Sequence, residues 1–230
     1  KYKLELLPTS PTFLHMLLLG RYYDKYDLSS LKIISYGSEP MPASTLTRMH
    51  QIFPDVRMKQ TYGLTELGAI RTKSKSSDSL WMKIGGDVHH QTKVVNGILY
   101  VRSDMAMLGY LNAEAPFDEE GWYNTGDHVE VDGDYFLIQG RDCERINVGG
   151  EKVYPAEVES VLLSIEGVED AAVVGVPNLI LGQVVEAHIY SNEDQSLLTK
   201  RIKAVCKEKL EKYKRPMKIV YVDAPFCSIL

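Results

Sequence analysis

The sequence is poor in cysteine, and the few cysteines that it has do not form a recognisable site. Cys143, Cys206 and Cys227 are far apart, and no CxxC or Cys/His spacing typical of zinc ligands accompanies them. This pattern predicts neither a disulfide framework nor a zinc site. A reducing cytoplasm is therefore the expected compartment.

Long apolar runs and an excess of positive charge are also absent. The apolar segment "FLHMLLLG" near the start is far too short to cross a bilayer, and no signal peptide is recognisable. The net charge of −5 argues against extensive nucleic-acid binding, although a small anionic ligand would feel only its local field. A hydrophobic content of 44% predicts a folded protein with a real core. The opening "KYKLELLPTSPT" resembles the middle of a domain, so we expect a fragment.

Strand-like and helix-like segments alternate in the first part of the chain. Strands are expected at 4–7, 31–36 and 56–63, with helices from Pro11 to about Gly20 and over 42–53. This alternation predicts a parallel, layered α/β sheet. Such sheets bind ligands at the carboxyl ends of their strands.

The pattern changes after about residue 74. Alternating strands are predicted at 97–103 and 128–140, and Asp132-Gly133 within the second is a strong hairpin signal. We expect residues 1–141 to be the C-terminal half of a large domain and residues 81–139 to form a small antiparallel β subdomain within it. Residues 142–230 are expected to form a small, mobile α+β domain. Helices are predicted after Pro155 and over 196–210, and strands are predicted at 171–176, 184–190 and 217–222.

Four polar clusters follow these elements. "YGSEPMP" (36–42) lies between a strand and a helix, where glycine permits close ligand approach, although Ser38 or Glu39 could simply cap the helix. "TYGLTELG" (61–68) offers a flat ring, a hydroxyl and a carboxylate suited to Mg²⁺; a turn with a core tyrosine is the alternative.

The third and fourth clusters lie on either side of the predicted hairpin. In "YNTGD" (123–127), Asp127 could accept hydrogen bonds from ribose hydroxyls, or it could form an ordinary Asx turn. "GRDCERINVGGEKVYPAEVE" (140–159) carries Arg141, Lys152 and the pair Gly149-Gly150, and it could also be an interdomain linker.

Taken in order, these clusters resemble the adenylate-forming superfamily, which comprises acyl-CoA synthetases, adenylation domains of nonribosomal peptide synthetases and firefly-type luciferases. The resemblance runs over nearly the whole chain. It implies ATP-dependent activation of a carboxylic acid to an acyl-adenylate, followed by transfer to a thiol, most simply that of CoA. Mg²⁺ and ATP or AMP are the implied ligands.

The resemblance also implies residue roles. Tyr62 would stack on adenine beside Gly63, Thr65 would contact the α-phosphate, and Glu66 would hold Mg²⁺. Asp127 and Arg141 would bind the ribose, Lys152 would reach phosphate, and Gly150 would line the acyl-acceptor tunnel. The remaining implied residues line the adenine base: Gly37, Ser38, Glu39 and Pro40.

The sequence departs from the family in several places. Cys143 stands where a hinge aspartate or lysine is usual, and Ile98 and Asn147 replace a glutamate and a lysine common in many members. The phosphate loop and the "GK" lysine near the C-terminus have no counterpart here, so we expect the isolated chain to perform the chemistry poorly. Loading of a carrier protein and a non-catalytic nucleotide-binding module remain alternatives.

Overall fold

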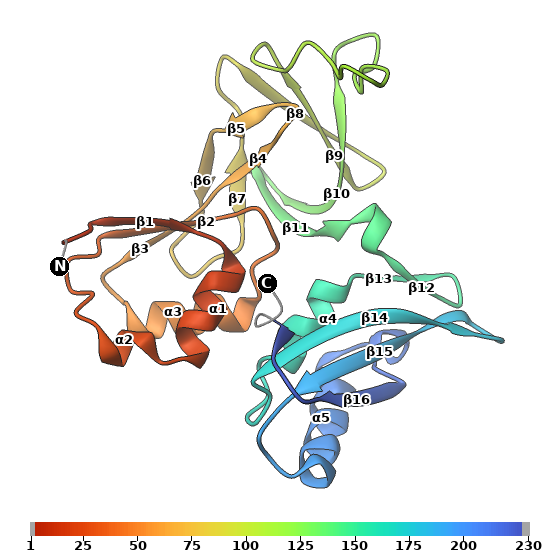
Figure 1. The fold of residues 1–230 in the computed structure, drawn as a ribbon. Helices are drawn as coiled ribbons and strands as arrows, with labels where there is room; N and C mark the ends of the chain where they lie inside the picture. The colour runs from red at the N-terminus through yellow and green to blue at the C-terminus, as the bar shows by residue number, and fades with distance from the viewer. Residues whose placement is uncertain (1–2, 227–230) are drawn as a thin grey trace. The chain divides into compact units, whose positions relative to one another are not determined.

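The computed structural model describes residues 3–226, which divide into two compact units. The first unit comprises the residues up to 41 together with 46–142, and the second comprises 42–45 and the residues from 143 onwards. Figure 1 shows the elements of both, and each unit is described separately below. Within residues 3–226, no helix combines the length and apolar character needed to cross a membrane.

A parallel three-stranded sheet forms the α/β part of the first unit, as predicted. Its strands are adjacent in the order β1-β2-β3. Two helices connect β1 to β2, and one helix connects β2 to β3. The strands are β1 (Leu6–Thr9), β2 (Ile33–Tyr36) and β3 (Arg57–Gln60), and the helices are α1 (Pro11–Leu19), α2 (Tyr22–Lys25) and α3 (Ala43–Ile52).

Local signals explain where the first helix begins and ends. Ser10 accepts a hydrogen bond from the Phe13 backbone N–H, Pro11 occupies the first turn, and Gly20 closes the helix. Leu14 from this helix packs in one core with Ile34 and Met58 of the sheet. Burial of this apolar face fixes the helix against the strands.

The second part of the first unit is antiparallel and begins earlier than residue 81. A β4–β5 hairpin (Tyr62–Leu64 and Gly68–Ile70) comes first. A six-stranded sheet follows in the order β6-β7-β11-β10-β9-β8. Its strands are β6 (Thr72–Ser74), β7 (Met82–Ile84), β8 (His90–Val95), β9 (Ile98–Ser103), β10 (Tyr123–Asp132) and β11 (Tyr135–Arg141).

Two details of this antiparallel part were not expected from the sequence. Ser74 ends strand β6, and its hydroxyl oxygen accepts a hydrogen bond from the Gln60 N–H of strand β3. The predicted hairpin is present, but Asp132 pairs with Tyr135, so the two-residue turn is Gly133-Asp134. Gly133 supplies the positive φ of 59° that this turn needs.

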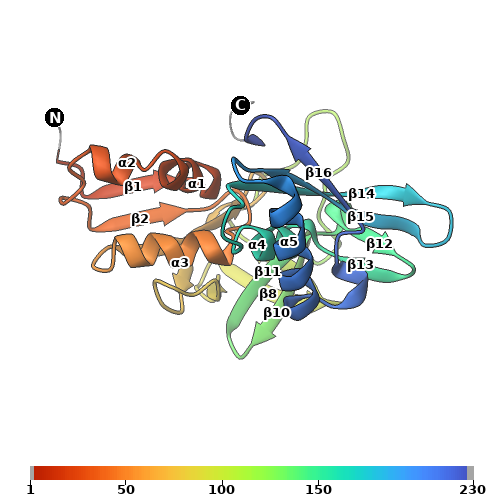
Figure 2. The same ribbon diagram turned by 90° about the horizontal axis from the view of Figure 1, so that it is seen from below.

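The second unit is an α+β fold with its own core. Its sheet has the order β13-β12-β15-β14, and β16 pairs in parallel with β15 (Figure 2). Leu162 and Leu198 from the two helices are fully buried against it. Its elements are β12 (Ile146–Val148), β13 (Glu151–Val153), α4 (Pro155–Leu162), β14 (Asp170–Asn178), β15 (Gly182–Tyr190), α5 (Gln195–Lys209) and β16 (Lys218–Val222), with short 3-10 turns at Asp142–Glu144 and Lys212–Lys214.

The predicted strands and helices of this region are present, but the β12–β13 hairpin was not expected. It lies inside the segment 140–159, where an interdomain linker was the alternative interpretation. Gly149 and Gly150 form its turn with φ of 61° and 96°, values that side-chain-bearing residues rarely adopt. The separate action and mobility of 1–141 and 142–230 stay predictions.

Candidate functional site

Three side chains from different strands of the first unit meet at a buried carboxylate. Asp127 is only 4% exposed, and its Oδ2 accepts a hydrogen bond of 2.5 Å from the Tyr62 hydroxyl. Its Oδ1 lies 3.4 Å from Nε of Arg141, whose own side chain is about half exposed. The negative charge of the buried carboxylate is thus stabilised by a hydrogen bond from the phenol on one side and by a partly solvent-exposed guanidinium on the other.

An irregularity in β10 directs Asp127 to this position. The pairing of β10 with β9 shifts register between Asn124 and His128, and Gly126 has a φ of 71°. Thr125 Oγ1 accepts from the Asp127 N–H at 3.1 Å and donates to the Leu99 carbonyl at 2.8 Å. Register then places Asp127 directly opposite Arg141 of β11.

The Asx turn that was the alternative role for Asp127 is formed by a different residue. Asn124 Oδ1 accepts a hydrogen bond of 2.9 Å from the Gly126 N–H. The Asp127 carboxylate therefore takes no part in the local turn. Its partners Tyr62 and Arg141 come from other strands.

Glu66 lies in the turn of the β4–β5 hairpin, where both its side chain and its backbone carbonyl accept hydrogen bonds. Its Oε1 accepts a hydrogen bond of 2.5 Å from the Tyr110 hydroxyl, and its backbone carbonyl accepts one of 2.9 Å from the Met107 N–H. The bond from Tyr110 is the main reason that the pKa of Glu66 lies below its usual range, and the positive charge of Arg141 adds to this. Arg141 therefore connects Glu66 electrostatically with Asp127.

Two tyrosines that interact with Glu66, Tyr110 and Tyr123, were not identified as site residues from the sequence. Burial raises the pKa of Tyr123 to about 12, and the negative charge of Glu66 is the next cause. Tyr123 could have been found, because it directly precedes the "NTGD" motif. Nothing in the sequence marks Tyr110, which is 44 residues from its partner Glu66.

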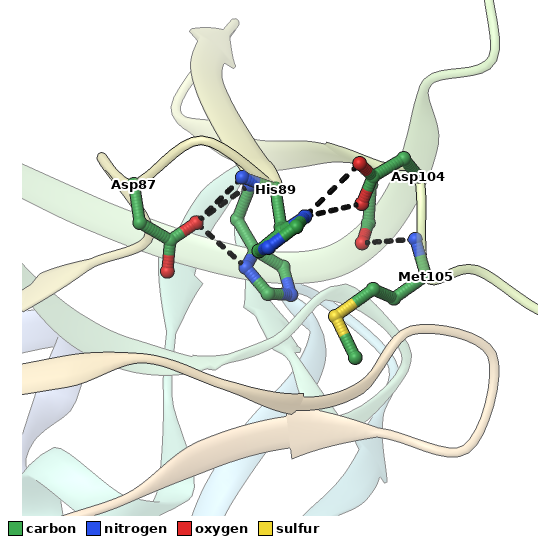
Figure 3. A network of polar contacts seen from close by, with 6 residues as sticks. Asp87, His89, Asp104 and Met105 are labelled. Carbon is green, nitrogen blue, oxygen red and sulfur yellow. Dashed lines mark hydrogen bonds and ion pairs between the residues drawn. The ribbon is translucent and has the colours of Figure 1, made fainter.

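The segment that carries Tyr110 is anchored where it leaves strand β9. Figure 3 shows the contacts: Nδ1 of His89 lies 3.0 Å from both carboxylate oxygens of Asp104, and Asp87 accepts from the His89 N–H at 3.0 Å. The Met105 N–H donates to Ser103 Oγ at 3.0 Å. These bonds fix the start of the segment whose later residues hold Glu66.

The turn of Gly37, Ser38, Glu39 and Pro40 follows β2, and the Tyr62 segment follows β3. Because these strands are parallel neighbours, both turns leave the same edge of the sheet. The Thr61 N–H donates to the Tyr36 carbonyl at 2.7 Å, which joins the two segments. A Cβ at Gly37 would lie 2.3 Å from Thr61 Oγ1, so only glycine fits there.

Two residues of this turn have properties that the sequence did not show. Ser38 has a φ of 76°, a backbone conformation that is uncommon and costly for residues other than glycine. The Glu39 carboxylate accepts a hydrogen bond of 2.7 Å from the Thr12 N–H in the first turn of α1. Glu39 thus caps α1, and not the helix after it as the alternative interpretation supposed.

The remaining predicted residues differ in setting. Thr65 is exposed, and among residues 3–226 its hydroxyl has no hydrogen-bond partner. A Cβ at Gly63 would lie 2.6 Å from the Gly68 carbonyl oxygen, so this glycine allows the hairpin strands to approach. Lys152 and Gly150 belong to the second unit, where Lys152 is exposed on β13 and the Gly150 N–H donates to Asn147 Oδ1 at 2.9 Å.

Comparison with known sequences gives two consecutive family matches. The family described as "AMP-binding enzyme" matches residues 1–111, and "AMP-binding enzyme C-terminal domain" matches residues 157–225. These ranges cover most of both units.

Curated relatives and solved structures agree with these matches. The chain is 31% identical to indoleacetate–CoA ligase of Aromatoleum aromaticum over 93% of its length, which is 45% of that protein. It is 29% identical to 4-coumarate–CoA ligase 1 of Glycine max, covering 97% of the chain and 85% of the relative. The crystal structure of the anthranilate CoA ligase AuaEII with anthranoyl-AMP superposes with a TM-score of 0.81 at 25% identity, over 97% of this chain and 47% of that one. The chain spans about half the length of most of these relatives.

Proposed function

The chain belongs to the family of AMP-binding enzymes, and from this premise we propose that it serves the ATP-dependent activation of a carboxylic acid and its transfer to CoA. The proposed activity is that of an acyl-CoA synthetase-like, AMP-forming acid–thiol ligase. In the first step a carboxylate oxygen attacks the α-phosphorus of ATP, and the bond to pyrophosphate breaks. In the second step the CoA sulfur attacks the acyl carbon, the bond to AMP breaks, and the thiol proton is released.

The observation that carries this proposal is the group formed by Tyr62, Asp127 and Arg141. Vicinal ribose hydroxyls are hydrogen-bond donors, and a carboxylate is their natural acceptor. Asp127 is held in place by Tyr62 and paired with a half-exposed guanidinium, and each of its carboxylate oxygens can accept more than one hydrogen bond. A rigid acceptor loses little conformational entropy on binding.

The aromatic face of Tyr62 and the hydroxyl of Thr65 complete the proposed nucleotide contacts. Tyr62 would lie against adenine, with the turn of Gly37 and Ser38 from the neighbouring strand on the same sheet edge. Thr65 is exposed and could donate to the α-phosphate. These roles follow the family pattern and are supported by the shared edge of β2 and β3.

The side chains present fit a Mg²⁺ ion that is held mainly through phosphate. Glu66 offers one carboxylate that the Tyr110 hydrogen bond helps to keep ionised, and residues 3–226 contain no group of three or more acidic, histidine or cysteine ligands. Mg²⁺ is typically bound by one or two carboxylates together with substrate phosphates. When bound, it would supply positive charge against the triphosphate.

Charge cancellation is needed because the first step brings an anion to a polyanion. Two like unit charges 4 Å apart repel by about 4 kcal/mol at an effective dielectric constant near 20. Arg141 contributes one fixed positive charge beside Asp127. Lys152 of the second unit is proposed to contribute another, and Gly150 to leave room for the pantetheine chain. A cytoplasmic location accompanies this proposal, since the exposed free thiol of Cys143 suits a reducing compartment.

The proposal is tested by calorimetric binding of AMP to the 230-residue chain. Asp127→Asn should lower AMP affinity by about tenfold to a hundredfold, because a hydrogen bond to a charged group contributes about 1.5–3 kcal/mol. Asp134→Asn, in the exposed hairpin turn, is the matched control and should change affinity less than about twofold. With 2′,3′-dideoxy-AMP, the wild-type and Asp127→Asn chains should bind equally.

If Asp127→Asn lowered the affinity for AMP and for its dideoxy analogue equally, Asp127 would not be a ribose-binding residue. Activity is tested separately by ATP–pyrophosphate exchange of the full-length protein across a panel of carboxylic acids. Acyl transfer to a carrier protein in place of CoA would select the alternative acceptor.

A further inference from the structure

A concave region lies beside β3, and none of the proposed site residues lines it. This basic pocket has a volume of about 290 Å³. Arg57 begins strand β3 and Tyr62 follows its end, so at about 3.3 Å per residue the two are separated by roughly 16 Å along the chain. Met58 and eight polar residues line the basic pocket: Arg57, Lys59, Thr72, Lys73, Ser74, Lys75, Ser76 and Ser77.

The charge around the basic pocket is opposite to that of the chain. The net charge of the whole chain is −5, yet residues 57–77 carry five cations and a single acid, Glu66. Lys75 is paired with Asp132 at 2.8 Å. Among residues 3–226, no carboxylate pairs with the other three cations of the basic pocket, Arg57, Lys59 and Lys73.

Hydroxyl groups in the basic pocket are held by the edge of the sheet. Ser74 Oγ accepts from the Gln60 N–H at 3.0 Å, and Ser77 Oγ accepts from the Met58 N–H at 3.3 Å. Neither hydroxyl proton has an acceptor within the described part of the chain. Each serine can therefore donate outward while its oxygen remains fixed to β3.

Strand alternation sorts the side chains of β3 between two faces. Met58 and Gln60 are buried, whereas Arg57 and Lys59 lie on the opposite face, where Arg57 is exposed and Lys59 is half-buried. The exposed Lys73 comes from β6, whose Thr72 and Ser74 bond β3. Two adjacent strands thus present cations and hydroxyl donors to one small space.

We propose that the basic pocket binds a small phosphorylated anion of the diphosphate class. Its polar lining side chains are cations and hydroxyls, and it contains no free carboxylate and no aromatic ring. A volume near 290 Å³ is at the lower limit for ligand sites, which suits a diphosphate group better than a whole nucleotide. Several cations around one space favour an anion with more than one charge.

The test is a titration of the ¹⁵N-labelled 230-residue chain with inorganic pyrophosphate, followed by amide chemical shifts without added metal. Binding should saturate, and the largest shifts should fall in residues 57–59 and 72–77. The double variant Lys59→Gln/Lys73→Gln should weaken pyrophosphate binding at least about tenfold. The control variant Lys203→Gln/Lys207→Gln removes the same charge from exposed positions on α5, and it should change pyrophosphate affinity less than about twofold.

Several outcomes would overturn the proposal. Equal weakening by the two double variants would mean that only general electrostatic attraction is at work. Largest shifts at 62–66 and 124–127 would place the anion at the proposed nucleotide site instead. Inorganic phosphate should bind more weakly than pyrophosphate, and equal binding would overturn the diphosphate assignment. The result does not depend on the proposed ligase activity.

Discussion

Tyr62 and Asp127 are 65 residues apart in the sequence, and the hydroxyl of one donates to the carboxylate of the other at 2.5 Å. This bond links the β4–β5 hairpin to strand β10. It brings together the two motifs, "TYGLTE" and "NTGD", on which the functional interpretation depends.

Removal of this hydroxyl should destabilise the first unit. Tyr62→Phe leaves the buried Asp127 carboxylate with one donor fewer, so the free energy of unfolding should fall by about 1–3 kcal/mol. Urea denaturation followed by fluorescence measures the change. Tyr26→Phe, at a position 65% exposed, is the control and should have little effect. An unchanged midpoint for Tyr62→Phe would mean that Asp127 is adequately solvated without it.

The acid titration of Glu66 should depend on Tyr110. The Tyr110 hydroxyl holds the pKa of Glu66 below its usual range, so Tyr110→Phe should raise that pKa, and the carboxylate should protonate at a higher pH during acidification. Side-chain carboxyl ¹³C NMR follows this directly. Tyr213→Phe removes the equivalent bond from Glu211 in the second unit and should leave Glu66 unchanged. A titration curve of Glu66 that is the same in both variants would contradict the assignment.

Alkaline pH should lower stability in part through Tyr123. Burial raises the pKa of Tyr123 to about 12, whereas an unfolded tyrosine ionises near 10. The native state keeps the proton over a range in which the unfolded state loses it, so the free energy of unfolding decreases as pH rises from about 10 to 12. Tyr123→Phe should make this decrease smaller in chemical denaturation at a series of pH values. An equally steep decrease in the variant would show that Tyr123 is not one of its causes.

The core of the second unit should depend on Leu198 and not on its neighbour. Leu198 is fully buried beside Ile202 on α5, whereas Leu197 is 62% exposed. Leu198→Ala should lower the free energy of unfolding of this unit by about 2–5 kcal/mol, because it removes buried methyl groups and leaves a cavity. Leu197→Ala should stay within about 0.5 kcal/mol of wild type. AMP binding, measured below the unfolding transition, should be the same in both variants if the nucleotide contacts lie in the first unit.

Short-range patterns account for much of the fold that could be predicted. The helix from Pro11 and its end at Gly20 follow from the proline, the capping Ser10 and the spacing of apolar residues. The hairpin near Gly133 follows from a turn residue between alternating strands, although its register differs by one position. The β12–β13 hairpin was missed because three-residue strands are too short to show periodicity.

The candidate site could be predicted in kind but not in its contacts. The sequence by itself determined which groups are available: a ring at Tyr62, carboxylates at Glu66 and Asp127, and a cation at Arg141, each next to an expected strand end. Only the tertiary structure decided which groups are hydrogen-bonded to each other. Glu39 accepts from the first turn of α1, and Glu66 accepts from Tyr110. The reason is physical: hydrogen-bond partners are set by strand register and bulges that join distant segments, and local propensity carries no record of that pairing.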